Sequence, residues 1–144
     1  MPEYTDIDSL ADLPDNVDKF DGVITGIESS GVMDDTAEMM PVYGLKEAGY
    51  TLQESSTPAM LGALDDAIRK QEDIVVTMWT PFWANGSYPL KRLEDPKGGY
   101  KMENDLTFEG TAGFGDEQPE VAEWLGSIKL DDQQYSDLEK AVTQ

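Results

Sequence analysis

The chain has 144 residues, of which 39% are hydrophobic, and it contains three tryptophans, six tyrosines and four phenylalanines. This length and composition predict one folded domain with a hydrophobic core rather than a disordered segment. Thirty acidic residues against ten basic ones give a formal net charge of −20, which is extreme for this size. A surface of this charge repels nucleic acid and anionic membranes, so neither is expected as a partner.

Cysteine and histidine are both absent from the sequence. Their absence excludes disulfides, thiol catalysis, imidazole acid–base catalysis and metal sites built from either residue. The acidic residues are scattered, and none of their spacings matches the ligands of a calcium-binding loop. We therefore expect no cofactor and no metal, and a solvated acidic surface adapted to salt. We also predict no membrane-spanning segment and no signal peptide in this chain.

Strands and helices are predicted to alternate in the first part of the chain. Residues 7–20 suggest a short helical entry, and the first strand is expected at Gly22–Ile27. The three-residue spacing of apolar side chains predicts a helix from Val32 to about Leu45. Pro41 lies inside this helix and should kink or shorten it.

A second strand is expected at residues 50–53, and a third at Ile74–Met78. Between them, Ser56 and Pro58 mark the start of a helix, because a hydroxyl caps the first turn and proline fits it. The order strand, helix, strand, helix, strand predicts an α/β fold with a mainly parallel sheet flanked by helices.

The rest of the chain is predicted to contain a long connection and two further helices. Residues 79–102 are rich in proline, glycine and tyrosine, and Leu106–Phe108 is expected to form another strand. Amphipathic helices are predicted from Pro119 to about Leu125 and from Asp131 to about Val142. Trp124, inside the first of these helices, is expected to pack in the core.

The strongest functional signal lies where the third strand runs into an aromatic loop that carries Trp79, Phe82 and Trp83. In open α/β folds, ligands bind at the carboxyl ends of the strands. An aromatic face attracts a quaternary ammonium group by about 0.5–2 kcal/mol per ring. The alternative is that Trp79 is simply buried under the loop that follows it, and for Trp83 we expect such a structural role.

A second signal is the turn of small residues that joins the first strand to the following helix. Free N–H groups at a helix start can hold an anion, and Gly31 would let a ligand approach the backbone closely. An ordinary tight turn explains the same residues. Together, the turn and Trp79 would suit a zwitterion with a quaternary ammonium head. Acidic pairs elsewhere lie near helix ends or on solvated faces, so no catalytic residue is expected.

At these residues the chain resembles the substrate-binding proteins of glycine betaine ABC transporters, and the resemblance covers nearly its whole length. The matching motifs include Phe20-Asp-Gly22 before Ile24-Thr-Gly-Ile27, Gly31-Val-Met33, Tyr43-Gly-Leu45, Ala59-Met-Leu61, Ile74-Val-Val-Thr77 before Trp79-Thr-Pro81, Leu93-Glu-Asp-Pro-Lys97 and Pro119-Glu-Val-Ala122.

The resemblance implies a type II periplasmic-binding-protein-like fold, in which two α/β lobes close on betaine. Complete proteins of this type are about twice as long, so residues 1–144 are expected to form one lobe with C-terminal helices. Carried over by position, the amides of Gly31 and Val32 would hold the carboxylate and Trp79 would be one ring of the ammonium cage. Ser30, Phe82 and Trp83 are expected to line the cleft.

The same resemblance implies an osmoprotective binding protein that performs no chemistry and delivers its ligand to a membrane permease. Its location would be extracytoplasmic, either periplasmic or lipid-anchored. Family members often have histidine where this chain has Phe82, so the choice among glycine betaine, proline betaine and choline-like ligands stays open. Half a cage should bind weakly, and the exposed cleft face of an isolated lobe is expected to favour self-association.

Two other classes of function compete with this interpretation. The chain could be a small acidic interaction domain whose aromatic residues pack against a partner and bind no small molecule. An enzyme built on carboxylates is the third interpretation, and it would need two acids that converge on one pocket.

Overall fold

The computed structural model describes residues 1–100 and 106–143. Its centre is a three-stranded parallel sheet in which β1 (Val23–Ile27) lies between β2 (Thr51–Ser55) and β3 (Val75–Val76). The positions of the first three predicted strands and the parallel α/β arrangement are thereby confirmed, although β3 is shorter than expected.

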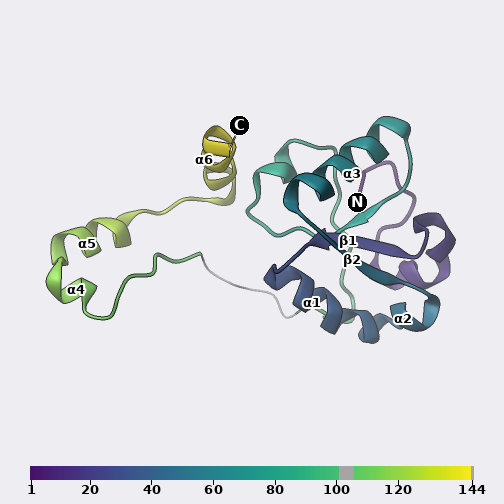
Figure 1. Cartoon of the computed structure of the whole chain (residues 1–144), viewed down its shortest axis with the longest axis horizontal. Coiled ribbons are helices and arrows are strands. Elements are labelled where there is room, and N and C mark those ends of the chain that lie inside the picture. The colour runs from purple at the N-terminus through teal and green to yellow at the C-terminus, as the bar shows by residue number, and fades with distance from the viewer. Residues whose placement is uncertain (101–105, 144) are drawn as a thin grey trace.

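Helices cover both faces of this sheet (Figure 1). On one face lie α1 (Gly31–Met39), the 3₁₀ helix η2 (Met40–Tyr43) and α2 (Leu45–Ala48), and on the other lies α3 (Thr57–Lys70). The crossovers from β1 to β2 and from β2 to β3 run in opposite directions across the sheet. Because such crossovers are right-handed, their helices lie on opposite faces.

The predicted helix boundaries have the expected local causes. Pro41 lies in η2, where the α1 geometry gives way to a tighter turn, so the predicted shortening is confirmed. The side-chain oxygen of Ser56 accepts a hydrogen bond from the Ala59 N–H at 3.4 Å and caps α3. Arg69 and Lys70 occupy the last turn of α3, where positive charge complements the helix dipole.

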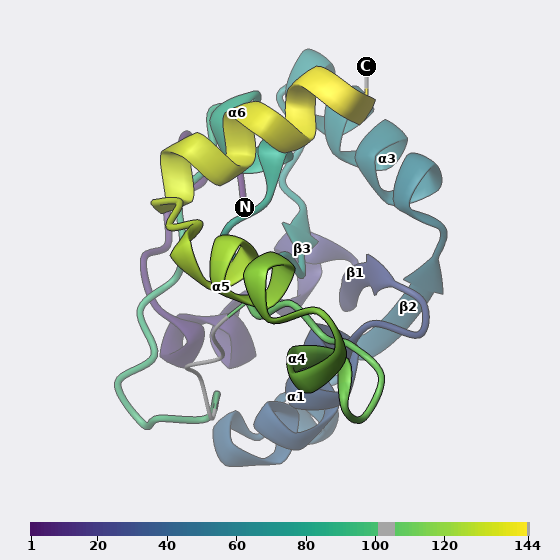
Figure 2. The same ribbon diagram turned by 90° about the vertical axis from the view of Figure 1, so that its left-hand side faces the viewer.

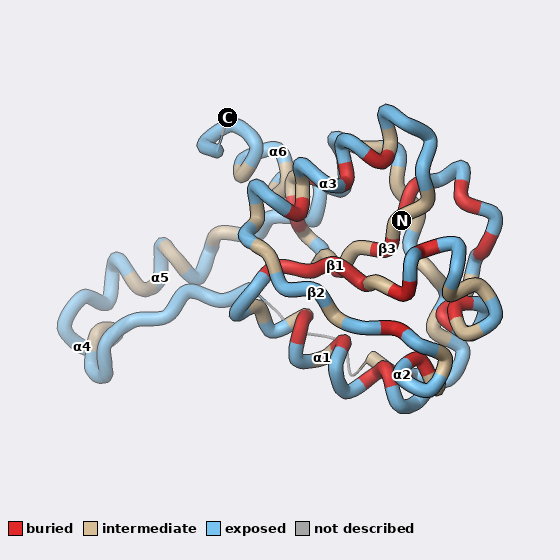
Figure 3. Tube along the Cα trace, turned by 45° about the vertical axis from the view of Figure 1, so that its right-hand side comes forward, coloured by how far each residue is buried: buried red, intermediate tan, exposed pale blue. Residues whose placement is uncertain are grey.

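The hydrophobic core lies between the sheet, its helices and the 3₁₀ segment η1 (Leu10–Phe20). Leu13, Ile24 and Leu45 are almost completely buried in it. Figure 3 shows this burial concentrated on β1 and on the inner sides of the helices. The first hundred residues therefore form a core of their own, which holds the carboxyl end of β3 in a defined position.

Gly26, in the middle of β1, has no room for a side chain. A Cβ atom there would lie 2.0 Å from Sδ of Met33 and 2.4 Å from Oγ1 of Thr77. We expect Gly26→Ala to lower the free energy of unfolding by about 1–3 kcal/mol, because overpacking forces neighbouring groups to move. Urea unfolding measures this change.

The matched control is Gly62→Ala in α3, where a Cβ would meet no atom within 4 Å. This substitution should stabilise the protein by about 0.5–1 kcal/mol, since alanine loses less backbone entropy than glycine in a helix. Equal unfolding midpoints for the two variants would contradict the close packing around Gly26.

The C-terminal part contains α4 (Phe114–Glu117), α5 (Pro119–Ser127) and α6 (Asp132–Thr143). The two amphipathic helices predicted here are confirmed as α5 and α6. In Figure 1, α4 and α5 stand away from the sheet, whereas α6 returns toward it. Figure 2 shows α4, α5 and α6 from the side on which they lie, in front of the sheet. No helix in the described ranges combines the length and apolar composition needed to cross a bilayer.

Two predictions for this part were wrong. Residues 106–108 form no strand, and the side chains of Leu106 and Phe108 are exposed. Trp124 is 63% exposed rather than part of the core. Both errors have one cause, because residues 106–130 stand away from the sheet, so their apolar side chains are not covered by the core. Residues 101 and 102 of the predicted long connection lie outside the described residues.

Candidate ligand-binding site

A cavity of about 520 Å³ runs along the outer edge of β3 and past its carboxyl end. Its volume lies within the usual range for small-molecule sites, about 300–1,000 Å³. Apolar side chains from the core line its floor, and the segment after β3 and helix α6 line its walls. β1 and β3 are neighbouring strands, and the crossover from β1 to β2 runs in the opposite direction to the one from β2 to β3. The loops after β1 and β3 therefore flank the point where the strand order reverses, which is where open α/β sheets bind ligands.

Trp79 lines this cavity three residues after the end of β3. Its side chain is half-buried, and its carbonyl accepts a hydrogen bond from Nδ2 of Asn85 at 2.8 Å. The ring centroid of Trp79 lies 4.6 Å from that of Phe82, with the planes tilted by 33°. Phe82 is 3% exposed and does not itself line the cavity, so it supports the Trp79 ring from within the protein.

Trp83 begins the 3₁₀ turn η3 (Trp83–Gly86) and also lines the cavity. Its ring centroid lies 5.8 Å from that of Phe82. The backbone N–H of Trp83 donates to Oε2 of Glu139 in α6 at 2.9 Å. Trp83 thus joins the aromatic loop to the C-terminal helix and contributes to the cavity wall as well.

At the turn after β1, α1 begins at Gly31 with Ser30 as its N-cap. The Ser30 hydroxyl donates to the Ile27 carbonyl at 2.6 Å and makes no cap bond to the helix. The Met33 N–H donates to the Ser30 carbonyl at 2.9 Å, so the first-turn N–H groups offered to an acceptor are those of Gly31 and Val32, which have no carbonyl partner within the helix. Val32 lines the cavity, whereas Ser30 and Gly31 lie beside it, and nothing approaches within 4 Å of a Cβ built on Gly31.

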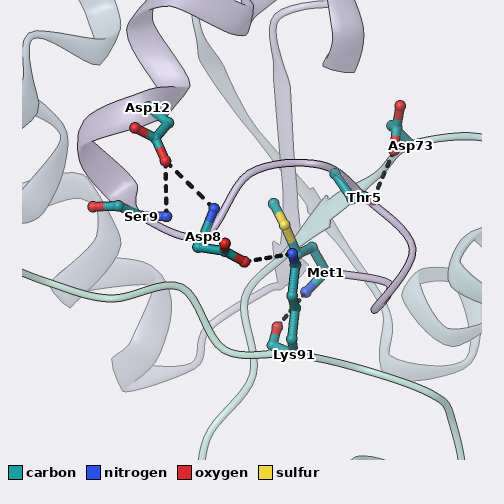
Figure 4. Close-up of polar contacts among 7 residues, drawn as sticks. All are labelled: Met1, Thr5, Asp8, Ser9, Asp12, Asp73 and Lys91. Atoms are coloured by element: carbon teal, nitrogen blue, oxygen red, sulfur yellow. Dashed lines mark hydrogen bonds and ion pairs between the residues drawn. The ribbon is translucent and has the colours of Figure 1, made fainter.

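Charged side chains of both signs line the cavity, namely Lys91, Arg92, Asp95, Asp132, Asp137 and Lys140. Two of them already have strong partners. Lys91 forms an ion pair with Asp8 at 2.6 Å, as Figure 4 shows. The carboxylate of Asp95 accepts several hydrogen bonds. Three of the chain's ten basic residues therefore lie at this one cavity, although the protein is strongly acidic overall.

The Asp95 carboxylate holds the segment after η3 against η2. It accepts hydrogen bonds from the Tyr43 hydroxyl, from the Gly99 N–H at 2.8 Å and from the Tyr100 N–H at 2.9 Å. Burial pushes the pKa of Asp95 up, but these hydrogen bonds and the nearby Arg92 charge outweigh it and hold the pKa below its usual value. The carboxylate is thus a structural anchor at the cavity wall.

Helix α6 is the part of the site that the sequence did not predict. Five of its residues line the cavity: Asp132, Gln133, Ser136, Asp137 and Lys140. An amphipathic pattern indicates that a helix packs on something, but not which surface it covers. The Glu139 to Trp83 bond spans 56 residues of sequence, and no local signal marks such a contact.

The sheet, its flanking helices and the cavity at the carboxyl end of β3 define an α/β lobe of the periplasmic-binding-protein class. A family profile described as the substrate binding domain of the ABC-type glycine betaine transport system matches residues 1–144. The chain belongs to this family.

Individual relatives agree with this assignment. The glycine betaine/carnitine transport binding protein GbuC of Listeria monocytogenes is 34% identical over 106 residues, which are 73% of this chain and 35% of GbuC. The closed structure of lactococcal OpuAC with glycine betaine is 32% identical with a TM-score of 0.78, covering 98% of this chain and 54% of OpuAC. The ProX protein of Borrelia burgdorferi is 26% identical with a TM-score of 0.78, covering 99% of this chain and 55% of ProX. The chain therefore spans about half the length of the solved relatives, and the 106 residues aligned with GbuC cover about a third of that protein.

Proposed function

We propose that this protein is the substrate-binding component of an ABC transporter for glycine betaine or a related quaternary ammonium solute, used in osmoprotection. The observation that carries the proposal is the half-buried ring of Trp79 on the wall of a ligand-sized cavity in a member of this family. Residues 1–144 would form one binding lobe with its C-terminal helices, located outside the cytoplasm, and would deliver the ligand to a membrane permease.

The two ends of a betaine need different partners, and both kinds line or adjoin the cavity. Trp79 offers an aromatic face to the trimethylammonium group, with Phe82 behind it and Trp83 beside it. The amide groups of Gly31 and Val32 would hold the carboxylate, in a turn stabilised by Ser30. Arg92 and Lys140 are a second candidate pair for the carboxylate, because both are charged side chains on the cavity wall.

An amide NMR titration with glycine betaine, taken into the millimolar range, tests the proposal. Shifts should centre on the Trp79 indole and on the amides of Gly31 and Val32. Shifts at Arg92 and Lys140 instead would move the carboxylate site to these two side chains. Glycine is the matched control ligand, since it has the carboxylate and lacks the methyl groups that the Trp79 ring should recognise.

The titration series is completed by choline, which lacks the carboxylate, and by proline betaine. Comparing the dissociation constants of all these compounds ranks them by affinity. The competing interpretation, an interaction domain without a small-molecule ligand, predicts that Trp79 responds to none of these compounds. A folded sample that shows no shift with any of them would overturn the proposal for this chain.

A further inference from the structure

Residues 95–100 form part of the cavity wall and lie directly against α1. Asp95 and Tyr100, at the two ends of this segment, both line the cavity. The contact with the helix is tight, because a Cβ atom built on Gly99 would lie 2.8 Å from Cγ of Met39, the last residue of α1. The segment is therefore held at a fixed position relative to α1.

Tyr100 is anchored to this wall through its backbone and reaches α1 with its side chain. Its N–H donates to Oδ2 of Asp95 at 2.9 Å. Its hydroxyl oxygen lies 2.9 Å from Oγ1 of Thr36, a fully buried residue of α1. Burial raises the pKa of the Tyr100 hydroxyl above its ordinary value of 10.0, so this group is protonated at neutral pH and can donate a hydrogen bond.

The direction of the bond between the two hydroxyl groups follows from a third group. Oγ1 of Thr36 lies 2.6 Å from the carbonyl oxygen of Val32, and a carbonyl can only accept. The single hydroxyl proton of Thr36 is therefore used at Val32, and the Tyr100 hydroxyl must donate to Thr36. Two directed hydrogen bonds, from Tyr100 to Thr36 and from Thr36 to Val32, thus join the cavity wall to the first turn of α1.

These two bonds end at the turn that would hold the carboxylate of the ligand. Val32 lines the cavity, and its N–H is one of the two first-turn donors offered to an acceptor. The N-cap residue Ser30 gives this turn no side-chain bond, because its hydroxyl donates back to the Ile27 carbonyl. The bond from Thr36 therefore supports the turn from the opposite side, and Tyr100 orients Thr36.

We propose that Tyr100 is a positioning residue for the carboxylate end of the ligand. Through Thr36, it holds the first turn of α1 so that the Gly31 and Val32 N–H groups are in place before the ligand arrives. The inference rests on the proposed function of the cavity. Hydrogen bonds weaken steeply when their geometry is poor, and a turn that needs no ordering binds more tightly than one that does. The trimethylammonium group, assigned to Trp79, does not use this turn. Tyr100 thus favours ligands with a carboxylate over choline.

Tyr100→Phe tests the inference, because it removes the hydroxyl and retains the ring that lines the cavity. NMR titrations of the wild type and the variant with glycine betaine and with choline measure the dissociation constants. We expect the affinity for glycine betaine to fall by about two- to tenfold, the effect of one net hydrogen bond, and the affinity for choline to stay unchanged. The amide signals of Gly31 and Val32 should also shift in the variant without ligand.

A second variant, Thr36→Val, breaks the same connection at its other member and should reproduce the loss of affinity for glycine betaine. Combining it with Tyr100→Phe should add no further loss, since both substitutions remove one interaction. Tyr50→Phe is the matched control. It removes a buried tyrosine hydroxyl that donates to the Leu13 carbonyl at 3.0 Å, and Tyr50 is not among the residues that line the cavity. This control should lower stability and leave both affinities unchanged.

The outcomes separate this inference from the proposed function. Equal losses of affinity for glycine betaine and choline in Tyr100→Phe would overturn the inference alone, because the hydroxyl would then support the whole cavity. Unchanged amide signals of Gly31 and Val32 in the variant without ligand would also overturn it, whichever ligands bind. Binding of neither ligand by the folded wild-type chain would overturn the proposed function, and this inference with it.

Discussion

Replacing Trp79 by alanine should weaken the binding of glycine betaine by about two- to thirtyfold, the range that corresponds to 0.5–2 kcal/mol for one aromatic face. Trp79 lines the cavity with a half-buried ring, and the variant would leave the ammonium group without that face. Trp79→Phe retains a smaller ring and should lose less affinity. The measurement is the dissociation constant from an NMR titration.

Trp124→Ala is the matched control for this experiment, because it removes an exposed indole from α5 and leaves the cavity lining unchanged. The methyl groups of the ligand provide a second control, since the more strongly hydrated ammonium group of glycine should depend on Trp79 less than the trimethylammonium group does. If Trp79→Ala and Trp124→Ala bind glycine betaine equally well, Trp79 does not contact the ammonium group. The carboxylate partners would then have to account for all of the affinity.

Replacing Asp95 by alanine should lower the free energy of unfolding at neutral pH by about 3 kcal/mol. The substitution removes an ionised acceptor, and each hydrogen bond to a charged group contributes about 1.5–3 kcal/mol. It also leaves the buried Tyr43 hydroxyl without the carboxylate that accepts its hydrogen bond. Urea unfolding of both proteins measures the difference, with Glu94→Ala as a control because the neighbouring Glu94 residue is exposed.

The effect of Asp95→Ala should also depend on pH. The pKa of Asp95 in the folded protein lies below its ordinary value of 3.8, so the folded state binds the proton less tightly than the unfolded chain does. The stability that the ionised carboxylate contributes is fully present above pH 3.8. It is lost as the pH falls through the lower pKa that Asp95 has in the folded protein. The stability difference between wild type and Asp95→Ala should therefore shrink in acid. A difference that grows in acid would contradict this assignment of the network.

The sequence by itself determined the elements whose causes are local. The β-branched run before Trp79 predicts a buried strand, Ser56 caps a helix, and Pro41 ends one, because each effect acts within a few residues. The alternation of these elements then predicts the parallel sheet, and the motifs around Gly31 and Trp79 predict the family. Each of these predictions agrees with the structure or with the family match.

Only the tertiary structure decided which surfaces meet. The ion pair between Lys91 and Asp8 and the bond between Glu139 and the Trp83 N–H join residues far apart in the sequence, which no local pattern can pair. The same limit explains why the predicted burial of Trp124 was wrong. Amphipathic spacing shows that a helix has an apolar side, but not whether anything covers that side. In this chain the sheet covers the apolar sides of α1 and α3, and it leaves that of α5 in water.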